Sequence, residues 1–452
     1  MTTQVQAKFE AARKAMAQIK DYTQEQIDHL VYESAKIIYE NAEPLARMAV
    51  EETGLGNVEH KIGKNENTAA VFYDYLKDKK SVGIIKEIPE EGIIEVAHPV
   101  GVVAAITPAT NPTVTPLGNF LHAIKGKNAV IVSPSPRAEK TTTQTIELIR
   151  EALEKNGAPK DLIQAVEEPT FEKSSEVMQL SDLILATGGP GLTIAAHSSG
   201  KPAYGVGPGN SPAIIDRDFD IETVAKMSVE ARGSDNGILC DCQELLIYPE
   251  ELENKLFDAL RKEGIVVYDK KDDVDKIRNI LFPGGTLDAD IIGKLAPEIA
   301  KHAGLTAPDS TEIIAVKIEG VGKEDYLNKE KMAPVLALKS YKTFGEAVDI
   351  AIKTMEESGG LGHTAGIFSH NDDHIRYAGE KIPVSRLLVN QPTPDAWGPA
   401  TNGLTPAVSE GCGTWGNNLL SGNVDYIHLL NISRIAYPLD REVPIPAKVF
   451  SK

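Results

Sequence analysis

Residues 98–112 read His-Pro-Val-Gly-Val-Val-Ala-Ala-Ile-Thr-Pro-Ala-Thr-Asn-Pro. Val102–Ile106 is a continuous apolar run, and a polar, proline-rich segment that holds Asn111 follows it at once. A short apolar run of this kind is typical of a strand that is buried on both faces of a parallel sheet. Ligands bind beyond the carboxyl ends of such strands, so the loop with Asn111 is where chemistry is expected.

Three more short apolar runs follow, and helical stretches such as Thr142–Lys155 separate them. The runs are Ala129–Val132, Leu183–Ala186 and Ala213–Ile215. Strands that alternate with helices predict a doubly wound α/β unit with a parallel sheet. A second α/β region is expected over residues 216–425. Its strand candidates are Leu245–Ile247, Ile313–Val316, Thr364–Phe368 and Leu387–Val389.

The first 54 residues are expected to be helical. Thr23 followed by Gln26 is a capping-box pattern, which begins a helix. Apolar residues then recur on one helical face, as in an amphipathic helix. They are Ile27, Leu30, Val31 and Ile38. Gly54 is expected to end this helical region, because glycine readily adopts the left-handed conformation of a helix C-terminus.

Residues 82–98 differ from their surroundings. Two β-rich runs flank the sequence Pro-Glu-Glu-Gly, which predicts a hairpin. The tail after residue 426 is also β-rich and extended. A hairpin between helical and α/β regions suggests an arm that reaches another subunit.

Composition limits the class of protein. The chain has 452 residues and a net charge of −18, which disfavours nucleic acid as a partner. No apolar run is long enough to span a bilayer, and the N-terminus has no secretory apolar segment. The three cysteines, an odd number, argue against a disulfide framework and for a reducing compartment. We therefore expect a cytoplasmic protein with no membrane partner.

The cysteines are the candidate nucleophiles. Cys240 ends the stretch Ser234-Asp-Asn-Gly-Ile-Leu-Cys, in which Gly237 permits an unusual backbone. A lone cysteine is more often an inert buried residue, and Cys242 reads as a back-up thiol or as packing. No nearby histidine or cysteine completes a zinc set, so no metal site is expected.

Two glycine-rich segments are candidate ligand loops. Gly188, Gly189 and Gly191 follow an apolar run and precede a helix, where a backbone can approach a phosphate. Taken alone, the loop Gly205–Asn210 reads as a tight turn. Taken alone, Glu330 is interpreted as a solvated charge. Taken alone, His363 is interpreted as a histidine of a loop whose hydrogen bonds are satisfied. Trp415, in Gly-Cys-Gly-Thr-Trp-Gly, reads equally as a pocket wall or as core packing.

Together the motifs resemble the aldehyde dehydrogenase superfamily, and within it the CoA-acylating branch. The resemblance covers nearly the whole chain and is strongest to acylating succinate-semialdehyde dehydrogenases and to the aldehyde dehydrogenase half of bifunctional aldehyde-alcohol dehydrogenases. The matching strings are HPVGVVAAITPATNP, SPSPRA, ATGGPG, PAYGVGPGN, DNGILC, GHTAGI, RLLVNQP and GCGTWG.

The resemblance implies an aldehyde dehydrogenase-like fold of two doubly wound α/β domains and a small β arm. Residues 1–81 and 99–215 would form the dinucleotide-binding domain, and residues 216–425 would form the catalytic domain. Residues 82–98 and 426–452 would be oligomerisation elements of a homodimer or homotetramer.

The resemblance also implies roles for individual residues. Cys240 matches the nucleophile, and the side-chain amide of Asn111 would form an oxyanion hole with the backbone N–H of Cys240. Glu330 matches the glutamate that holds the nicotinamide ribose. The remaining dinucleotide contacts would be Thr107, Ser133, Ser135, Gly188, Gly189 and Gly191. His363 is a candidate for assisting deprotonation of the CoA thiol.

Three departures from the hydrolytic family are informative. The loop Gly205–Asn210 lacks the glutamate that activates water, so a thiol such as CoA is expected to attack the thioester instead. A Lys-Pro-x-Glu motif is replaced by Ser133–Pro136, which with the adjacent Arg137 leaves both NAD and NADP open as cofactor. Gln243 and Glu244 replace a Glu-Gln pair of the close relatives, which is expected to alter the pocket lining.

The expected reaction interconverts an aldehyde, CoA and NAD(P)+ with an acyl-CoA and NAD(P)H. The substrate would be a short aldehyde, and anionic ones such as succinate semialdehyde and sulfoacetaldehyde are among the candidates. The segment 393–402 is expected to shape the pocket. The alternatives are an acyl-phosphate reductase of the same superfamily and an inactive nucleotide-binding or assembly protein.

Overall fold

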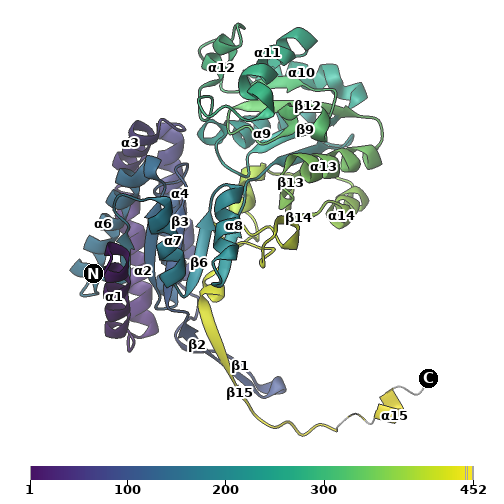
Figure 1. The fold of residues 1–452 in the computed structure, drawn as a ribbon. Coiled ribbons are helices and arrows are strands. Elements are labelled where there is room, and N and C mark those ends of the chain that lie inside the picture. The colour runs from purple at the N-terminus through teal and green to yellow at the C-terminus, as the bar shows by residue number, and fades with distance from the viewer. Residues whose placement is uncertain (1, 443, 445, 450–452) are drawn as a thin grey trace.

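The computed structural model describes residues 2–442, 444 and 446–449. Its ribbon divides into two lobes and a projecting arm (Figure 1). Each lobe is built on a sheet of parallel strands that helices cover, and the arm is a small antiparallel sheet. The predicted α/β class with a β arm is confirmed.

The first lobe contains a five-stranded sheet in which every neighbouring pair is parallel. In spatial order its strands are β5 (Ile163–Ala165), β4 (Ala129–Pro134), β3 (Val102–Thr107), β6 (Leu183–Thr187) and β7 (Ala203–Val206). Every residue of β3 and β4 is buried, as the continuous apolar runs predict. The expectation that Ala213–Ile215 belongs to this sheet is wrong, because that run pairs in the other lobe.

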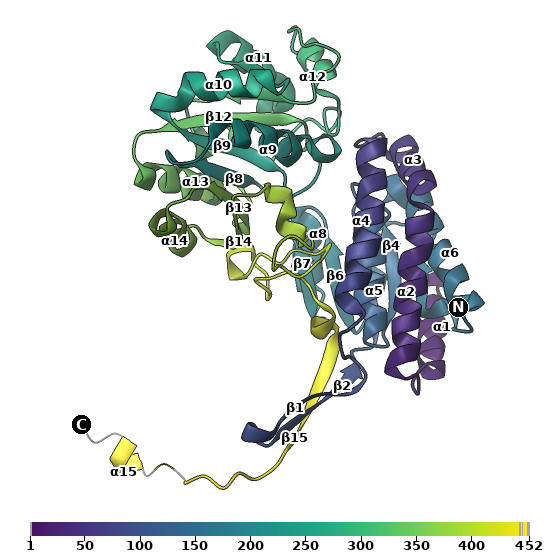
Figure 2. The ribbon, with the colours of Figure 1, turned by 180° about the vertical axis from the view of Figure 1, so that it is seen from behind.

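Helices cover both faces of this sheet. They are α1 (Gln4–Gln18), α2 (Gln24–Glu40), α3 (Ala42–Thr53), α4 (Val58–Leu76), α5 (Val114–Lys125), α6 (Glu139–Lys155), α7 (Phe171–Leu180) and α8 (Pro190–Ser198). Helices α7 and α8 lie in front in Figure 1, whereas α4, α2 and α5 lie in front in the opposite view of Figure 2. The predicted capping box of Thr23 begins α2, and Gly54 ends α3 with φ +67°, so both helix signals are confirmed.

The second lobe contains a seven-stranded sheet, also parallel throughout. In spatial order its strands are β10 (Val266–Tyr268), β11 (Ile314–Lys317), β12 (Val335–Tyr341), β9 (Gln243–Pro249), β8 (Ser211–Ile215), β13 (Gly362–Phe368) and β14 (Val384–Val389). Its helices are α9 (Ile221–Gly233), α10 (Glu253–Lys262), α11 (Lys271–Leu281), α12 (Ala296–His302), α13 (Phe344–Ser358) and α14 (Asp372–Lys381).

Both faces of the second sheet are buried, and strand β9 shows why. Leu245 and Ile247 belong to one hydrophobic cluster, whereas Leu246 and Tyr248 belong to another. Successive side chains of a strand point to opposite faces, so a wholly apolar strand needs a core on each side. All four strand candidates of this region are confirmed. The short strands β5, β7, β10 and also β12 were not predicted.

The arm consists of β1 (Gly83–Ile88), β2 (Ile93–Pro99) and β15 (Leu430–Ala436), with β2 in the middle. Gly92, at φ +64°, closes the hairpin between β1 and β2. The predicted hairpin is therefore confirmed, and the predicted β-rich tail contains the strand β15. Residues 443, 445 and 450–452 of the predicted element 426–452 lie outside the described residues. Beyond β15 the chain continues away from both lobes to the short helix α15 (Pro446–Val449) (Figures 1 and 2).

The two large sheets meet end to end. The chain leaves the carboxyl end of β7 at Val206, and residues 207–210 lead directly to the amino end of β8. The loop with Asn111 follows the carboxyl end of β3, whereas Cys240 precedes the amino end of β9. The candidate residues of the second lobe therefore lie at amino ends of strands, opposite to the general rule for parallel sheets. Within the described residues, no helix is both long and apolar enough to cross a membrane.

Candidate active site

Cys240 follows a tight turn whose backbone is left-handed at three successive residues. Asp235, Asn236 and Gly237 have φ values of +50°, +56° and +71° in the short helix η4 (Ser234–Gly237). Such conformations cost free energy in non-glycine residues and persist only where contacts hold them. The Asn236 amide donates to the carbonyl oxygens of Gly56 and Gly293, at 3.2 and 3.1 Å. This turn leaves Cys240 partly exposed at the junction of the lobes.

The loop 207–210 lies directly against Cys240. A Cβ atom at Gly209 would overlap the carbonyl oxygen of Cys240, so only glycine allows this approach. The backbone N–H of Gly209 donates to the carboxylate of Glu330. The Asn210 amide donates to the Asn328 carbonyl at 2.9 Å. The predicted loop is correct from Gly207 onward, whereas Gly205 lies within β7.

Two buried carboxyl groups, those of Asp241 and Glu410, act electrostatically on the Cys240 thiol. Asp241 follows Cys240, and Asp241 is hydrogen-bonded to Glu410. Burial raises the pKa of the Cys240 thiol well above its usual value, and Glu410 and Asp241 raise it further. Without a ligand, the resting cysteine is therefore a neutral thiol at pH 7, and it must lose a proton before it can act as a nucleophile.

His363 lies within β13 and is fully buried. Its Nδ1 lies 3.0 Å from the hydroxyl of Thr364, while its Nε2 lies 3.9 Å from Glu410 Oε2. Burial and the nearby Arg386 lower the pKa of His363 to about 3, so the ring is neutral at pH 7. The backbone there is crowded, because a Cβ atom at Gly362 would overlap the Cys412 carbonyl.

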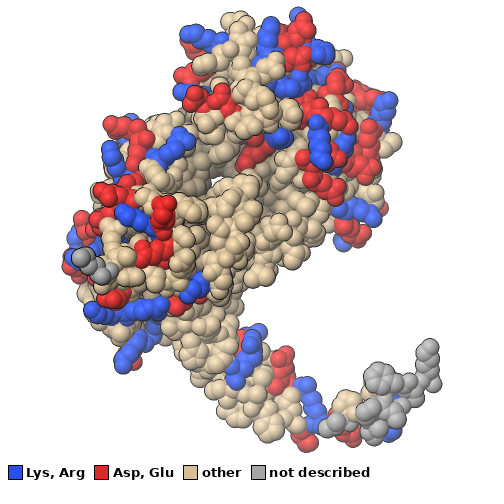
Figure 3. All heavy atoms as spheres, viewed as in Figure 1, with Lys and Arg blue, Asp and Glu red and all other residues tan. Residues whose placement is uncertain are grey.

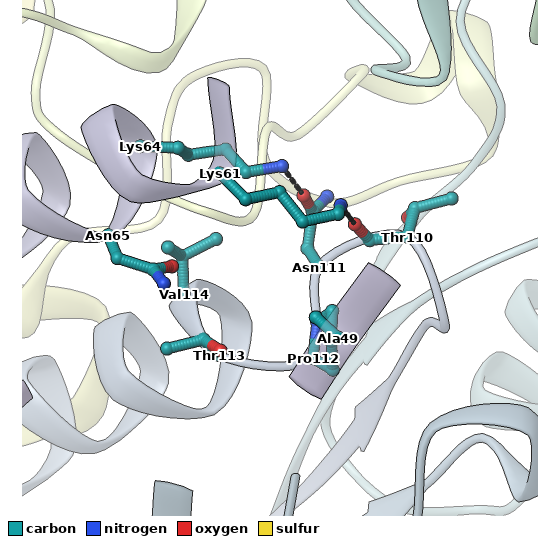
Figure 4. Close-up of a pocket in the computed structure, with 9 residues that line it drawn as sticks. All are labelled: Ala49, Lys61, Lys64, Asn65, Thr110, Asn111, Pro112, Thr113 and Val114. Carbon is teal, nitrogen blue, oxygen red and sulfur yellow. Dashed lines mark hydrogen bonds between the residues drawn. The ribbon is translucent and has the colours of Figure 1, made fainter. Parts of the chain in front are cut away.

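The Asn111 side chain is held by a lysine of α4. The Lys64 ammonium donates to Asn111 Oδ1 at 2.7 Å (Figure 4). It also donates to Asp235 Oδ2 at 2.6 Å. Lys61, one helical turn earlier, donates to the Thr110 carbonyl at 3.1 Å and to the same Asp235 oxygen at 2.7 Å. The amide oxygen of Asn111 is thereby occupied, which leaves its NH2 group as the available donor.

Asp235 connects this lysine pair to the cysteine turn. Burial raises the pKa of its carboxyl, but the charges of Lys64 and Lys61 outweigh burial and lower the pKa to about 2. Burial, with the charge of Lys64, lowers the pKa of Lys61 to about 8. One ionic cluster therefore joins α4, the Asn111 loop and the turn before Cys240.

The glycine turn after β6 has the open space that a ligand requires. Gly189 caps the N-terminus of α8, and a Cβ atom at Gly189 or Gly191 would meet no atom within 4 Å. At Gly188 a Cβ atom would crowd Leu192. Thr107 ends β3, and its buried hydroxyl has no hydrogen-bond partner in the described part of the chain. An open helix N-terminus and an unused hydroxyl fit a bound phosphate or ribose.

The other predicted cofactor contacts are engaged within the protein or lie at its surface. The hydroxyl of Ser133 lies 2.9 Å from that of Ser174 in α7. Ser135 begins a short helical turn and accepts a hydrogen bond from the N–H of Arg137. The exposed Arg137 guanidinium donates to the Thr53 carbonyl at 3.3 Å.

Glu330 precedes β12 and is partly exposed beside the loop 207–210. Burial raises the pKa of its carboxyl to about 8, and the charge of Glu244 adds to that rise. Glu244 itself is buried and forms ion pairs of 2.5 Å with Arg232 and 2.7 Å with Lys331. These ion pairs direct Glu244 into an internal charge cluster.

A partly exposed thiol and a glycine loop without a carboxylate lie against each other where the two sheets join. The model of the aldehyde dehydrogenase family matches residues 1–273. The chain belongs to the aldehyde dehydrogenase family. Its relatives include the acetylating succinate-semialdehyde dehydrogenase of Clostridium kluyveri, which is 46% identical over 97% of this chain and 96% of the relative.

Solved structures of the family are similar in fold. An acetylating aldehyde dehydrogenase from Geobacillus thermoglucosidasius has a TM-score of 0.93 and 40% identity, covering 98% of each chain. A Rhodopseudomonas palustris propionaldehyde dehydrogenase with bound CoA and an acylated cysteine has a TM-score of 0.85 and 26% identity. That similarity covers 96% of this chain and 97% of the other.

Sequence reasoning missed several residues of this site. It assigned no role to the lysine pair of α4, to Asp241, or to Glu410 with Arg386. Asp241 stands directly after the cysteine and Glu410 directly before Gly-Cys-Gly, so both could have been noticed. The lysine pair has no such signal, because only the tertiary fold brings α4 to the Asn111 loop.

The structure also shows the burial and contacts of the other two cysteines and of Trp415. Cys242 is buried, with its sulfur 3.7 Å from the Ser234 carbonyl, and burial raises its pKa. Cys412 is buried and accepts a contact from the N–H of Gly207. Trp415 is 48% exposed, so it does not belong to the core. The described residues contain no group of three or more side chains suited to hold a metal ion.

Proposed function

We propose that this protein is a CoA-acylating aldehyde dehydrogenase that uses NAD(P) and carries the acyl group on Cys240. The observation that carries this proposal is the loop 207–210. It lies against Cys240 yet presents only glycine, proline and asparagine there. With no carboxylate on the loop to activate water, transfer of the acyl group to a thiol is favoured over hydrolysis. The names of the acetylating and propionaldehyde relatives support the same reaction.

The chemistry begins when the Cys240 thiol loses its proton to water and the resulting thiolate attacks the aldehyde carbon. The NH2 group of Asn111 and the N–H of Cys240 donate to the developing oxyanion. One such donor contributes about 3–4 kcal/mol to transition-state stabilisation. A bound nicotinamide would supply the acceptor for the hydride of the former aldehyde carbon. Cys240 is then a thioester, which passes the acyl group to the thiol of CoA.

The cofactor would lie across the carboxyl end of the first sheet. Gly188, Gly189 and Gly191 would hold its phosphates at the N-terminus of α8, and Glu330 would accept hydrogen bonds from a ribose. Thr107, Ser133, Ser135 and Arg137 would provide the remaining contacts. These side chains are compatible with both NAD and NADP.

His363 remains our candidate for deprotonating the CoA thiol. A neutral ring with an unpartnered Nε2 can accept a proton. The depressed pKa makes the protonated ring costly, and the carboxylate of Glu410, with Oε2 at 3.9 Å, partly offsets this cost.

We also propose that the arm forms the subunit interface of a homodimer or homotetramer in the cytoplasm. Ile84, Ile435 and Tyr437 of the arm region are 50%, 45% and 57% exposed, an unusual use of large apolar side chains. Charged side chains are scattered over the outer surfaces of both lobes, whereas an uncharged surface extends from the middle of the molecule to the base of the arm (Figure 3). The described cysteines are all free, which suits a reducing compartment.

The decisive experiment uses purified protein with short aldehydes, CoA and each nicotinamide cofactor. Absorbance of the reduced cofactor and chromatography of the product are both recorded. We expect acyl-CoA, no turnover without CoA, and no activity in Cys240→Ser. Release of free acid without CoA, or turnover with an acyl phosphate in place of acyl-CoA in the reverse direction, would overturn the assignment.

A further inference from the structure

Three buried polar atoms near Cys240 have no hydrogen-bond partner in the described part of the chain. They are Asp241 Oδ1, Glu410 Oε2 and His363 Nε2. The three residues are only 5%, 5% and 0% exposed. Folded proteins leave few buried polar atoms unpaired, and each one calls for an explanation such as a bound group.

These atoms belong to one cluster. Asp241 and Glu410 are hydrogen-bonded to each other, and His363 Nε2 lies 3.9 Å from Glu410 Oε2, too far for a hydrogen bond. Asp241 is the sequence neighbour of Cys240, and both carboxylates act electrostatically on its thiol. The unpaired atoms therefore belong to one buried cluster that includes the sequence neighbour of Cys240 and two carboxyl groups that act on its thiol.

Arg386 does not donate a close hydrogen bond to the carboxyl groups of Asp241 and Glu410, which we call the acid pair. Its guanidinium donates to the carbonyls of Gly411 at 2.9 Å and of His363 at 3.0 Å, and to the Asn423 amide oxygen at 3.1 Å. Its Nε approaches Glu410 Oε2 only to 3.7 Å. Arg386 thus supplies a compensating charge, while Asp241 Oδ1 and Glu410 Oε2 remain open as acceptors.

The acid pair is suited to a ligand that donates hydrogen bonds. Burial raises the pKa of both carboxyl groups, and the charge of Glu410 raises that of Asp241 further, so the pair tends to retain a proton. Its remaining oxygens can only accept. A carboxylate or sulfonate tail brings no donor and would be repelled by any ionised member of the pair.

We propose that Asp241 and Glu410 form a substrate subsite that accepts hydrogen bonds from a hydroxyl or ammonium group near the aldehyde carbon. The inference rests on the proposed CoA-acylating activity and narrows its substrate class. It favours hydroxylated or aminated short aldehydes over unsubstituted ones and over the anionic candidates.

The test begins with the unmodified enzyme and four aldehydes of similar length: propionaldehyde, lactaldehyde, 3-aminopropionaldehyde and succinate semialdehyde. The value of kcat/KM is measured for each with CoA and the better nicotinamide cofactor. A hydrogen bond to a charged group discriminates about 10- to 100-fold. We expect kcat/KM for the hydroxy or the amino aldehyde to exceed that for propionaldehyde by such a factor. Whichever of these two aldehydes has the higher kcat/KM identifies the preferred donor group.

The isosteric variants Asp241→Asn and Glu410→Gln then connect the preference to the pair. For each variant we expect the kcat/KM of the donor-bearing aldehyde, divided by the kcat/KM of propionaldehyde, to fall about tenfold or more. This expectation holds whatever happens to the absolute rate. Asp309→Asn, at an exposed aspartate of the loop before β11, is the matched control and should keep the parental ratio. Thermal unfolding of each variant shows whether it is folded.

The outcomes separate this inference from the proposed function. CoA-dependent turnover of propionaldehyde without any preference for a donor group, or a preference for succinate semialdehyde, overturns the inference alone. No CoA-dependent turnover of any aldehyde overturns the proposed function as well. Because the unmodified enzyme decides the first question, a variant that fails to fold does not rescue the inference.

Discussion

Lys64→Met should slow the chemical step by releasing Asn111. The variant keeps the length and most of the volume of the side chain but removes both ionic hydrogen bonds, to Asn111 Oδ1 at 2.7 Å and to Asp235 Oδ2 at 2.6 Å. Once its oxygen is free, the Asn111 amide can rotate, and its NH2 group no longer points reliably at the oxyanion.

The magnitude follows from what that donor contributes. Complete loss of an oxyanion donor costs about 10²- to 10³-fold in kcat, and a misplacement of about 1 Å costs up to about 10²-fold. Lys64→Met leaves the donor present but unrestrained, so we expect kcat to fall about 10- to 100-fold. We expect a smaller change in the KM for the aldehyde, because the donor acts on charge that develops in the transition state.

Lys61→Met is the matched control. Lys61 binds the same Asp235 oxygen and the neighbouring Thr110 carbonyl, but it does not touch the Asn111 side chain. Each variant leaves one lysine on Asp235, so both should lose a similar free energy of unfolding, about 1–3 kcal/mol. Thermal unfolding and the rate of Cys240 alkylation report on fold and thiol placement. The reasoning fails if kcat falls by the same factor in both variants, or if Lys64→Met retains the parental kcat.

Three further predictions concern other parts of the molecule. Gly209→Ala should abolish acyl transfer, because its Cβ atom would overlap the Cys240 carbonyl and displace the cysteine. Mass spectrometry should then detect no acylated protein after incubation with an acyl-CoA. The pKa of Glu330 is raised to about 8, so its carboxyl group ionises as the pH rises from about 7 to 9 and cofactor binding should become stronger. Fluorescence titration should show that cofactor affinity rises with pH in the parent and does not change with pH in Glu330→Gln. Thr23→Ala should lower the free energy of unfolding by about 1 kcal/mol in denaturant titrations while leaving kcat unchanged, because the capping box of α2 is lost.

Much of the fold follows from local pattern. Apolar runs such as Val102–Ile106 predicted the central strands, because a strand covered on both faces has no polar positions. The Thr23 capping box and Gly54 predicted helix ends, since these signals act within a few residues. The sheet to which Ala213–Ile215 belongs was predicted wrongly. A run of apolar residues shows that a strand is buried, but it does not show which neighbours it pairs with.

The sequence by itself determined the α/β class, the hairpin, Cys240 as candidate nucleophile and the absence of a carboxylate in the loop 207–210. All of these depend on residue types and short spacings. Only the tertiary structure brought Lys64 to Asn111, and Glu410 to Asp241. These pairs are separated by 47 and 169 positions in the chain. Hydrogen bonds and charges act over a few ångströms of space whatever the distance along the chain, so the partners appear only once the two sheets are placed end to end.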